Sequence, residues 1–400
     1  MKLKNKGILL FFSLFVFFVS TAHAQVYRVS LLTCEPGDEL YSAFGHSAIR
    51  IMDLGTGRDM VFNYGTFDFD TPFFLYKFAR RTLDYKLDVT TYARFIQVYS
   101  AEGRAISEQV LDISPPQARS LVEFLDVNLL PDRRFYRYDF FFDNCATRIR
   151  DAIELTLGDE LVWKEPETEA EPKTFRNLID ECILTSVWAD FGIDLALGAV
   201  IDEEASSYDA QFLPDYMQAA FARAEIHGKD RKGIRPLVSE TRVILDFPPA
   251  QQKSWGLFNP YVLLWLLAIL FAVITYLGFK RKRLYLGFDI ALFSILGILG
   301  IVIFLLWFAT DHIATKMNWN ILWAFPGHLI LAFALLSKNL KSWIRKYLLF
   351  ALIAADAAVV FWIFGWQSFH PSIVPLLLVI ILRTNYLYYN IGKHKVLASS

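Results

Sequence analysis

The hydrophobic pattern of the chain changes near residue 250. From Tyr261 onward, apolar runs recur at lengths that cross about 30 Å of hydrocarbon, which takes roughly 20 residues of helix. They predict five membrane-spanning helices, at about 261–279, 284–308, 321–337, 347–366 and 371–387. Before this point, short segments of alternating apolar and polar residues predict a separate α+β domain.

Strand and helix signals fill this α+β domain. Alternation predicts the strands of a mainly antiparallel sheet at 26–31, 46–51, 60–64, 85–89 and 106–111. Ser114 and the two prolines after it predict a helix to about residue 129, and Asp143 or Asn144 caps a second helix that ends at Leu157. Two more helices are predicted near 174–190 and 209–225, and an acidic solvated loop at 164–173.

The N-terminus and the loop charges predict the orientation of both parts. Residues 1–24 combine three lysines, an apolar run and small residues up to Ala24, which is typical of a cleaved secretory signal peptide; an uncleaved anchor helix is the alternative. Basic loops after the first and third spans mark the cytoplasmic side. We therefore expect a periplasmic domain at 25–250, a transmembrane domain at 251–390 and a cytoplasmic tail at 388–400 of a bacterial inner-membrane protein.

Composition agrees with a protein that lies partly in lipid. The apolar fraction is 54% and the aromatic fraction 16%, more than soluble proteins carry. The formal net charge is −1, and no basic cluster alternates with aromatic residues outside the membrane flanks. Nucleic acid is therefore excluded as a partner.

Cys145 and His46 are the candidate catalytic pair of the exported domain. Cys145 opens a predicted helix, where free backbone N–H groups and the helix dipole favour a thiolate. His46 enters a strand after Gly45 and is placed to act as the general base that a cysteine nucleophile needs.

Two alternatives to this pairing stay open at the level of residues. In the first, Cys145 and His46 only pack in the core, as single cysteines and histidines often do. In the second, Cys34 is the nucleophile, although no helix follows it to favour its thiolate. Three cysteines in an oxidising compartment leave at least one thiol unpaired. If Cys34 and Cys182 formed a disulfide, Cys145 would be the free thiol.

Three motifs in this order resemble one protein family. They lie at 40–50 around Phe44-Gly45-His46, at 62–69 around Asn63-Tyr64-Gly65, and at 143–151 around Asn144-Cys145-Ala146-Thr147. Together with the signal peptide and the trailing spans they resemble the Bacteroides-type lipoprotein N-acyltransferases (Lnb). The resemblance implies an α+β exported domain similar to the permuted papain-like NlpC/P60 and lecithin:retinol acyltransferase group.

The resemblance also implies roles for single residues. Cys145 matches the nucleophile and His46 the base, and Asn63 is the candidate for the third, orienting residue, with Ser47 and Tyr41 behind it. Other polar residues of the motifs are expected to contact substrate, and the set is Tyr41, Ser47, Arg50, Asn144 and Arg148.

The reaction implied is an acyl transfer between two lipids. A membrane glycerophospholipid is the expected acyl donor, and the α-amine of a diacylglyceryl-cysteine at a lipoprotein N-terminus is the expected acceptor. Aromatic stretches at 73–76 and 140–142 are candidates for an acyl groove, and Arg80, Arg81, Arg133 and Arg134 are candidates for phosphate contacts.

Polar residues also cluster at the predicted outer ends of the spans. Among them His312 and His328 are candidate substrate-binding residues, because polar groups at the edge of hydrocarbon are costly unless they are paired or wetted. Interfacial anchoring is the alternative. The histidine spacing fits no metal-ligand motif, so neither a metal nor another cofactor is expected.

Two other functions compete with acyl transfer. A cysteine amidohydrolase acting on peptidoglycan would use the same pair, but it has no need of five spans. A non-enzymatic envelope binding protein would need neither Cys145 nor His46. The oligomeric state is left undetermined by the sequence.

Overall fold

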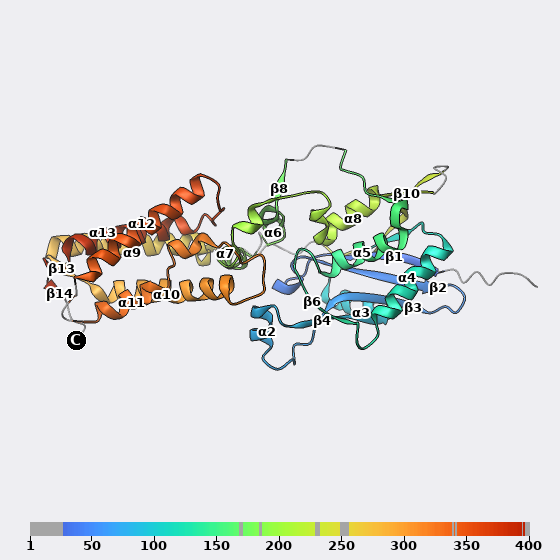
Figure 1. Ribbon diagram of the computed structural model, residues 1–400, viewed down its shortest axis with the longest axis horizontal. Helices are drawn as coiled ribbons and strands as arrows, with labels where there is room; N and C mark the ends of the chain where they lie inside the picture. The colour runs from blue at the N-terminus through green and yellow to red at the C-terminus, as the bar shows by residue number, and fades with distance from the viewer. Residues whose placement is uncertain are drawn as a thin grey trace, which may run out of the picture.

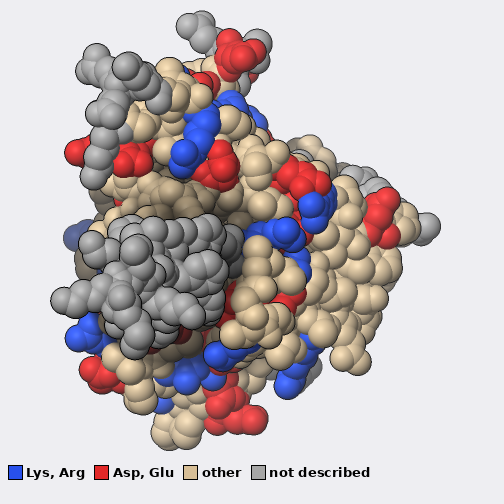
Figure 2. All heavy atoms as spheres, turned by 90° about the vertical axis from the view of Figure 1, so that its right-hand side faces the viewer, with Lys and Arg blue, Asp and Glu red and all other residues tan. Residues whose placement is uncertain are grey.

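A sheet-containing domain and a helical bundle lie end to end in the computed structural model (Figure 1). The structure describes residues 27–167, 171–183, 186–228, 233–248, 256–337, 340, 342–393 and 395–396. The predicted signal peptide and part of the predicted acidic loop at 164–173 lie outside these residues. On the face farthest from the bundle, acidic and basic side chains are interspersed (Figure 2).

Seven antiparallel strands form the central sheet, in the order β12-β5-β1-β2-β3-β4-β6. The strands are β1 (Tyr27–Cys34), β2 (His46–Asp53), β3 (Asp59–Thr66), β4 (Asp84–Thr91), β5 (Ile106–Leu111), β6 (Phe135–Arg137) and β12 (Val238–Leu245). All five strands predicted from the alternation are confirmed, whereas the two edge strands β6 and β12 were not expected. The α+β class follows.

Helices cover both faces of this sheet. On one face lie α4 (Pro115–Asn128), α5 (Cys145–Leu157) and α8 (Pro214–Arg223), and on the other lies α3 (Tyr92–Glu102). The alternation along β2 explains the division, because Ile49 packs toward α5 while Ala48 packs toward Phe95 of α3. The predicted starts of α4 and α5 are confirmed.

Shorter elements connect the sheet to the bundle. They are α2 (Phe74–Arg80), α6 (Phe175–Ile183), α7 (Val187–Ala196) and the 3-10 turns η3 (Ala199–Asp202) and η4 (Asp209–Phe212). The single helix predicted at 174–190 is thus two helices, and the one at 209–225 is η4 followed by α8. The turn η1 (Leu40–Ser42) leads into β2. Two small sheets complete the domain: β11 (Ile234–Pro236), β10 (Glu225–His227) and β7 (Leu161–Val162) form one, and β8 (Lys173–Thr174) and β9 (Glu204–Ala205) form the other.

Four helices of the described bundle are long and apolar enough to cross a membrane. They are α9 (Pro260–Arg281), α10 (Leu286–Phe308), α12 (Trp343–Ile363) and α13 (Ile373–Asn390). The third predicted span, 321–337, is instead the shorter apolar segment Trp319–Leu335, made of η6 (Trp319–Leu322) and α11 (Gly327–Leu335). The break has a local cause, because Pro326 has no N–H to continue a helix from η6.

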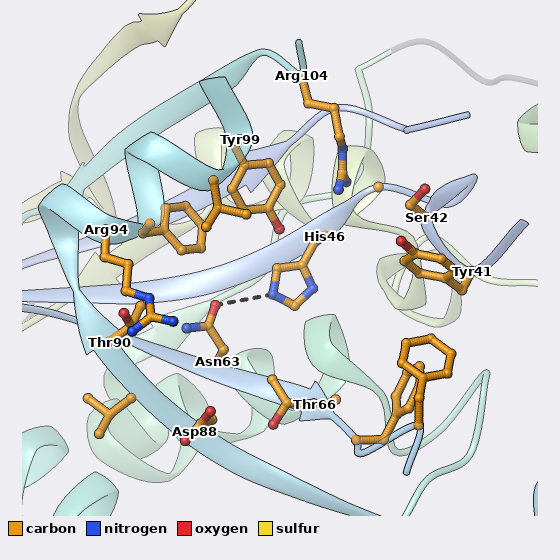
Figure 3. Close-up of a pocket in the computed structure, with 17 residues that line it drawn as sticks. Tyr41, Ser42, His46, Asn63, Thr66, Asp88, Thr90, Arg94, Tyr99 and Arg104 are labelled. Atoms are coloured by element: carbon orange, nitrogen blue, oxygen red, sulfur yellow. Dashed lines mark hydrogen bonds between the residues drawn. The ribbon is translucent and has the colours of Figure 1, made fainter. Parts of the chain in front are cut away.

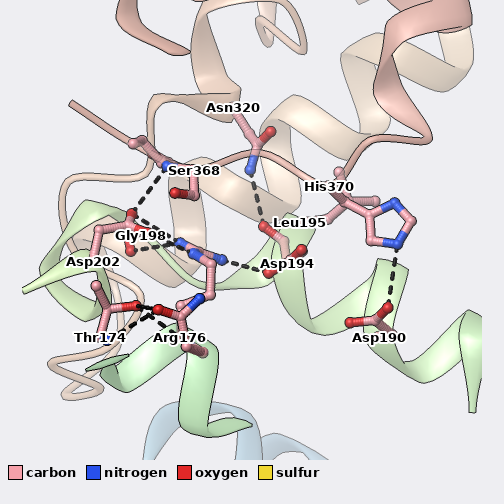
Figure 4. Close-up of polar contacts among 12 residues, drawn as sticks. Thr174, Arg176, Asp190, Asp194, Leu195, Gly198, Asp202, Asn320, Ser368 and His370 are labelled. Carbon is pink, nitrogen blue, oxygen red and sulfur yellow. Dashed lines mark hydrogen bonds and ion pairs between the residues drawn. The ribbon is translucent and has the colours of Figure 1, made fainter. Parts of the chain in front are cut away.

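Polar contacts join the α+β domain to the outer end of the bundle (Figure 4). Arg176 of α6 is almost fully buried and bonds to Asp194 and Asp202, while Ser368 N–H donates to the same Asp202 carboxylate. Asn320 of η6 donates to the Asp194 carbonyl at 3.1 Å. Because Ser368 and Asn320 of the bundle reach these partners only when the two parts meet, the contact fixes the height of the domain above the bundle.

Candidate active site

Asn144 builds the helix start that presents Cys145. Its Oδ1 accepts hydrogen bonds from the N–H groups of Ala146 and Thr147 at 2.8 and 2.9 Å, which caps α5. Its Nδ2 donates to the carbonyls of Phe140 and Phe212 at 2.8 and 2.7 Å. The side chain is buried, so Asn144 fixes the helix start rather than facing a substrate.

Cys145 is a partly exposed residue, and three backbone N–H groups lie close to its Sγ. They belong to Ser47, Ala146 and Cys145 itself. Burial raises the pKa of the thiol above its ordinary value, and the three N–H groups only oppose this effect. The expected preference for the thiolate is therefore outweighed by desolvation, and the resting thiol is protonated.

His46 and Asn63 form a second hydrogen-bonded pair (Figure 3). Nε2 of His46 lies 3.3 Å from Oδ1 of Asn63, whose Nδ2 donates to the Val61 carbonyl at 3.4 Å. Because the amide oxygen faces the ring, Nε2 is the protonated nitrogen and Nδ1 keeps its lone pair. Burial lowers the pKa of His46 to about 4, so the imidazole is neutral at pH 7.

Gly65 brings the two halves of the site together. The pairing of β3 with β4 shifts register between Asn63 and Thr66, and Gly65 in this irregularity has a φ of 84°. A Cβ at Gly65 would lie 3.5 Å from the Cβ of Cys145. Glycine permits the left-handed backbone at this point, where the strand that carries Asn63 packs against the start of α5.

A pocket of about 530 Å³ opens on His46, Asn63 and Gly65. Other lining residues come from the segment before β2, the end of β3 and the α3 side: Tyr41, Ser42, Thr66, Phe67, Phe69, Arg94, Tyr99 and Arg104 (Figure 3). Sequence reasoning missed the α3 contribution. The Thr91 cap before α3 is a local signal for the helix, but which face of the sheet it covers is not a local property.

The other residues of the motifs lie in different surroundings. Tyr41 is exposed at the pocket mouth and contacts Phe69 edge-on, with ring centroids 6.1 Å apart. The Ser47 side chain is fully buried, so this residue reaches Cys145 through its backbone. Arg50 is bound by Asp59 and Glu108.

Arg148 likewise has partners within the domain. It pairs with Asp143 and lies over the Tyr136 ring, 3.9 Å from its centroid. These contacts tie the first turns of α5 to β6. We infer that its guanidinium orients the helix, because its charge is already neutralised.

The polar residues at the outer bundle end form separate contacts. His312 Nε2 donates to the Phe78 carbonyl at 3.1 Å, which joins the loop after α10 to α2. His328 is buried between the Trp323 carbonyl, 3.1 Å away, and the Tyr347 hydroxyl, 3.0 Å away. The structure therefore places His312 beside the α+β domain and His328 inside the bundle.

One group of carboxylates in the described residues has a spacing that fits a metal ion. Oxygen atoms of Asp180, Asp190 and Asp194 lie within 4.8 Å of one another. Asp190 is paired with His370 and Asp194 with Arg176, and burial with the neighbouring carboxylates raises the pKa of Asp180 to about 7. The group belongs to the contact between the two parts of the chain and not to the Cys145 site.

All three cysteines are free thiols. Cys34 and Cys182, whose pairing the sequence left open, form no disulfide. Cys34 is buried in the sheet, where desolvation raises its pKa to about 12. A buried thiol with so high a pKa is a poor nucleophile, so Cys145 is the better candidate nucleophile of the two.

The fold and these residues define a class of protein: a multi-pass membrane protein whose α+β domain carries a cysteine at a helix start and a hydrogen-bonded His–Asn pair. Residues 18–181 match the family model for the Lnb N-terminal periplasmic domain, and residues 251–395 match the Lnb transmembrane domain. The chain belongs to the Lnb family, and its N-terminal domain is periplasmic. No curated protein and no solved structure gives a match. Membership of this family suggests an acyltransferase that acts on lipoproteins.

Proposed function

We propose that the protein is a lipoprotein N-acyltransferase that carries its acyl group on Cys145. The observation that supports this most directly is the approach of the Ser47 N–H to the Cys145 thiol, which brings the two family motifs together in the fold. His46 and Asn63 complete a nucleophile, base and orienting residue. A cysteine at a helix start over an antiparallel sheet, with histidine earlier in the chain, also agrees with a permuted papain-like arrangement.

The first half-reaction acylates the thiol. Nδ1 of neutral His46 takes the Cys145 proton while Sγ attacks an ester carbonyl of a glycerophospholipid. The backbone N–H groups around Sγ stabilise the negative charge that develops on the carbonyl oxygen. The bond to the glycerol oxygen breaks, the imidazolium protonates this oxygen, and a lysophospholipid leaves.

The second half-reaction transfers the acyl group to an amine. The neutral α-amine of a diacylglyceryl-cysteine attacks the thioester carbonyl, and His46 takes the proton that the amine loses. The carbon–sulfur bond breaks and the imidazolium returns the proton to Sγ. The products are an amide-linked third acyl chain and the free thiol of Cys145.

The membrane domain favours this reaction over peptidoglycan hydrolysis. Both lipids are confined to the membrane, and the contacts around Arg176 hold the site at the outer end of the bundle. Such tethering replaces diffusion by proximity. A peptidoglycan amidohydrolase would gain nothing from a fixed height above lipid.

Complementation of a strain that lacks its lipoprotein N-acyltransferase tests the function. Wild type and Cys182→Ser should restore three-chain lipoprotein N-termini, read by mass spectrometry, whereas Cys145→Ser should leave two-chain forms. Persistence of two-chain lipoproteins with well-expressed wild type would exclude the function. Release of peptidoglycan stem peptides by wild type, absent in Cys145→Ser, would support the amidohydrolase instead.

A further inference from the structure

Large apolar side chains cover the outside of α2 and the residue before it. The exposed fractions are 81% for Phe73, 78% for Leu75, 60% for Tyr76 and 51% for Phe78. No residue of α2 is buried. A contiguous exposed apolar surface of this kind marks an interaction site in a folded protein.

The backbone holds α2 in an unusual position. Phe73 before the helix and Arg81 after it both have left-handed backbone, with φ of 58° and 59°. Residues other than glycine rarely adopt this conformation, and it persists where the surrounding structure requires it. The two residues turn the chain out of the sheet and back, so that α2 projects from the domain.

Hydrogen bonds place α2 at the outer end of the spans. Asp311 N–H donates to the Arg80 carbonyl at 3.3 Å, Arg81 donates to the Asp311 carbonyl at 3.1 Å, and His312 donates to Phe78. Asp311 follows α10, whose last residue, Phe308, is 60% exposed. Figure 1 shows α2 projecting from the sheet toward the bundle. Its apolar surface therefore continues the lipid-facing surface of α10.

A row of aromatic rings connects α2 to the pocket. Phe78 stacks on Phe74 at 6.2 Å between centroids, Phe74 lies 5.2 Å from Phe69, and Phe69 lies 6.1 Å from Tyr41. Phe69 and Tyr41 line the same pocket as His46. The row thus runs from the bundle end to the pocket that His46 lines.

We propose that α2 lies in the outer leaflet of the membrane and that the aromatic row receives an acyl chain of a glycerophospholipid from it. Phe73 and Leu75 insert among the acyl chains, as in other interfacial helices. Lys77 and Arg80 lie on the same short helix and provide positive charge for the lipid phosphates. The transfer of this acyl chain to Cys145 rests on the proposed function, whereas the contact of α2 with the membrane does not.

Photo-crosslinking of the full-length protein tests the contact. A diazirine amino acid replaces Leu75, or in the control Leu155, which is 69% exposed on α5. In proteoliposomes of phosphatidylethanolamine and phosphatidylglycerol, we expect about tenfold more phospholipid adduct at position 75 than at position 155. Equal yields at the two positions would overturn the proposal, whether or not the protein is an acyltransferase.

Kinetics of matched variants test the lipid path. Leu75→Asp should lower Cys145 acylation by vesicle phospholipid about tenfold, while acylation by the water-soluble p-nitrophenyl butyrate stays within about twofold of wild type. Leu155→Asp should change neither rate. Unchanged vesicle kinetics in folded Leu75→Asp would refute the path. If wild type fails to acylate Cys145 with either ester, the proposed function fails, and the crosslinking result still decides the membrane contact.

Discussion

The backbone N–H of Ser47 lies close to the Sγ of Cys145. This approach brings the start of β2 to the start of α5. It places the thiol next to the residue that follows His46, and Gly65 of the neighbouring strand packs against Cys145. The two motifs are therefore neighbours in the fold, although neither specifies the other.

Replacement of the nucleophile should abolish acyl transfer. Cys145→Ser should lower the rate of acylation by p-nitrophenyl butyrate by at least about 1000-fold, because a hydroxyl is far less readily deprotonated than a thiol. Intact-protein mass spectrometry measures the acyl adduct. Cys182→Ser is the control and should acylate at the wild-type rate, and an adduct that persists in Cys145→Ser would identify another nucleophile.

The acid limb of the pH profile should lie well below the ordinary pKa of histidine. The base must be neutral, and burial lowers the pKa of His46 from 6.5 to about 4. Single-turnover acylation should therefore stay nearly constant as the pH falls from about 7 to about 5, and decline only near pH 4. A half-maximal rate near pH 6.5 would show that the base is solvated or is another group.

Asn63 should control both the ring orientation and this acid limb. Asn63→Ala removes the hydrogen bond, which should lower the acylation rate about 100-fold through loss of alignment. Asn63→Asp adds a negative charge beside His46, stabilises the imidazolium and should move the acid limb up by about one to two pH units. Identical pH profiles of wild type and Asn63→Asp would contradict a contact between the two side chains in solution.

Loss of the α5 cap should reduce stability. Asn144→Ala removes the acceptor for two helix N–H groups and the donor for two buried carbonyls, with an expected loss of about 2–4 kcal/mol in the free energy of unfolding. Asn144→Asp keeps the acceptor and should fall between this variant and wild type. Denaturant unfolding of the detergent-solubilised proteins measures the order of their stabilities. A smaller loss of stability for Asn144→Ala than for Asn144→Asp would argue against the cap.

The contact between domain and bundle should tolerate no side chain at Gly198. A Cβ there would lie 1.8 Å from the Lys316 carbonyl oxygen, whereas a Cβ at Gly192 would meet no atom within 4 Å. Gly198→Ala should therefore lower the unfolding temperature in detergent, at a cost of about 1–3 kcal/mol, and slow acylation by vesicle phospholipid more than by the soluble ester. Gly192→Ala should match wild type, and equal behaviour of the two variants would mean that the contact is loose.

Local patterns were enough to predict the elements that carry the site. Side-chain alternation identified five of the seven sheet strands, and the Asn144 cap with Gly158 identified both ends of α5. Hydropathy located the membrane half but not the break at Pro326, where backbone chemistry overrides an apolar run. The short edge strand β6 and the exposed helix α2 lack a periodic core signal and were missed.

The sequence by itself determined which residues have the chemistry: a thiol at a helix start, an imidazole at a strand start and an amide on a neighbouring segment. These properties depend on residue type and on a few chain neighbours. The tertiary structure alone decided that the Ser47 amide lies close to the thiol, that burial leaves both Cys145 and His46 uncharged, and that α3 lines the pocket. Desolvation and contacts between distant segments arise only when the chain packs, so no local pattern encodes them.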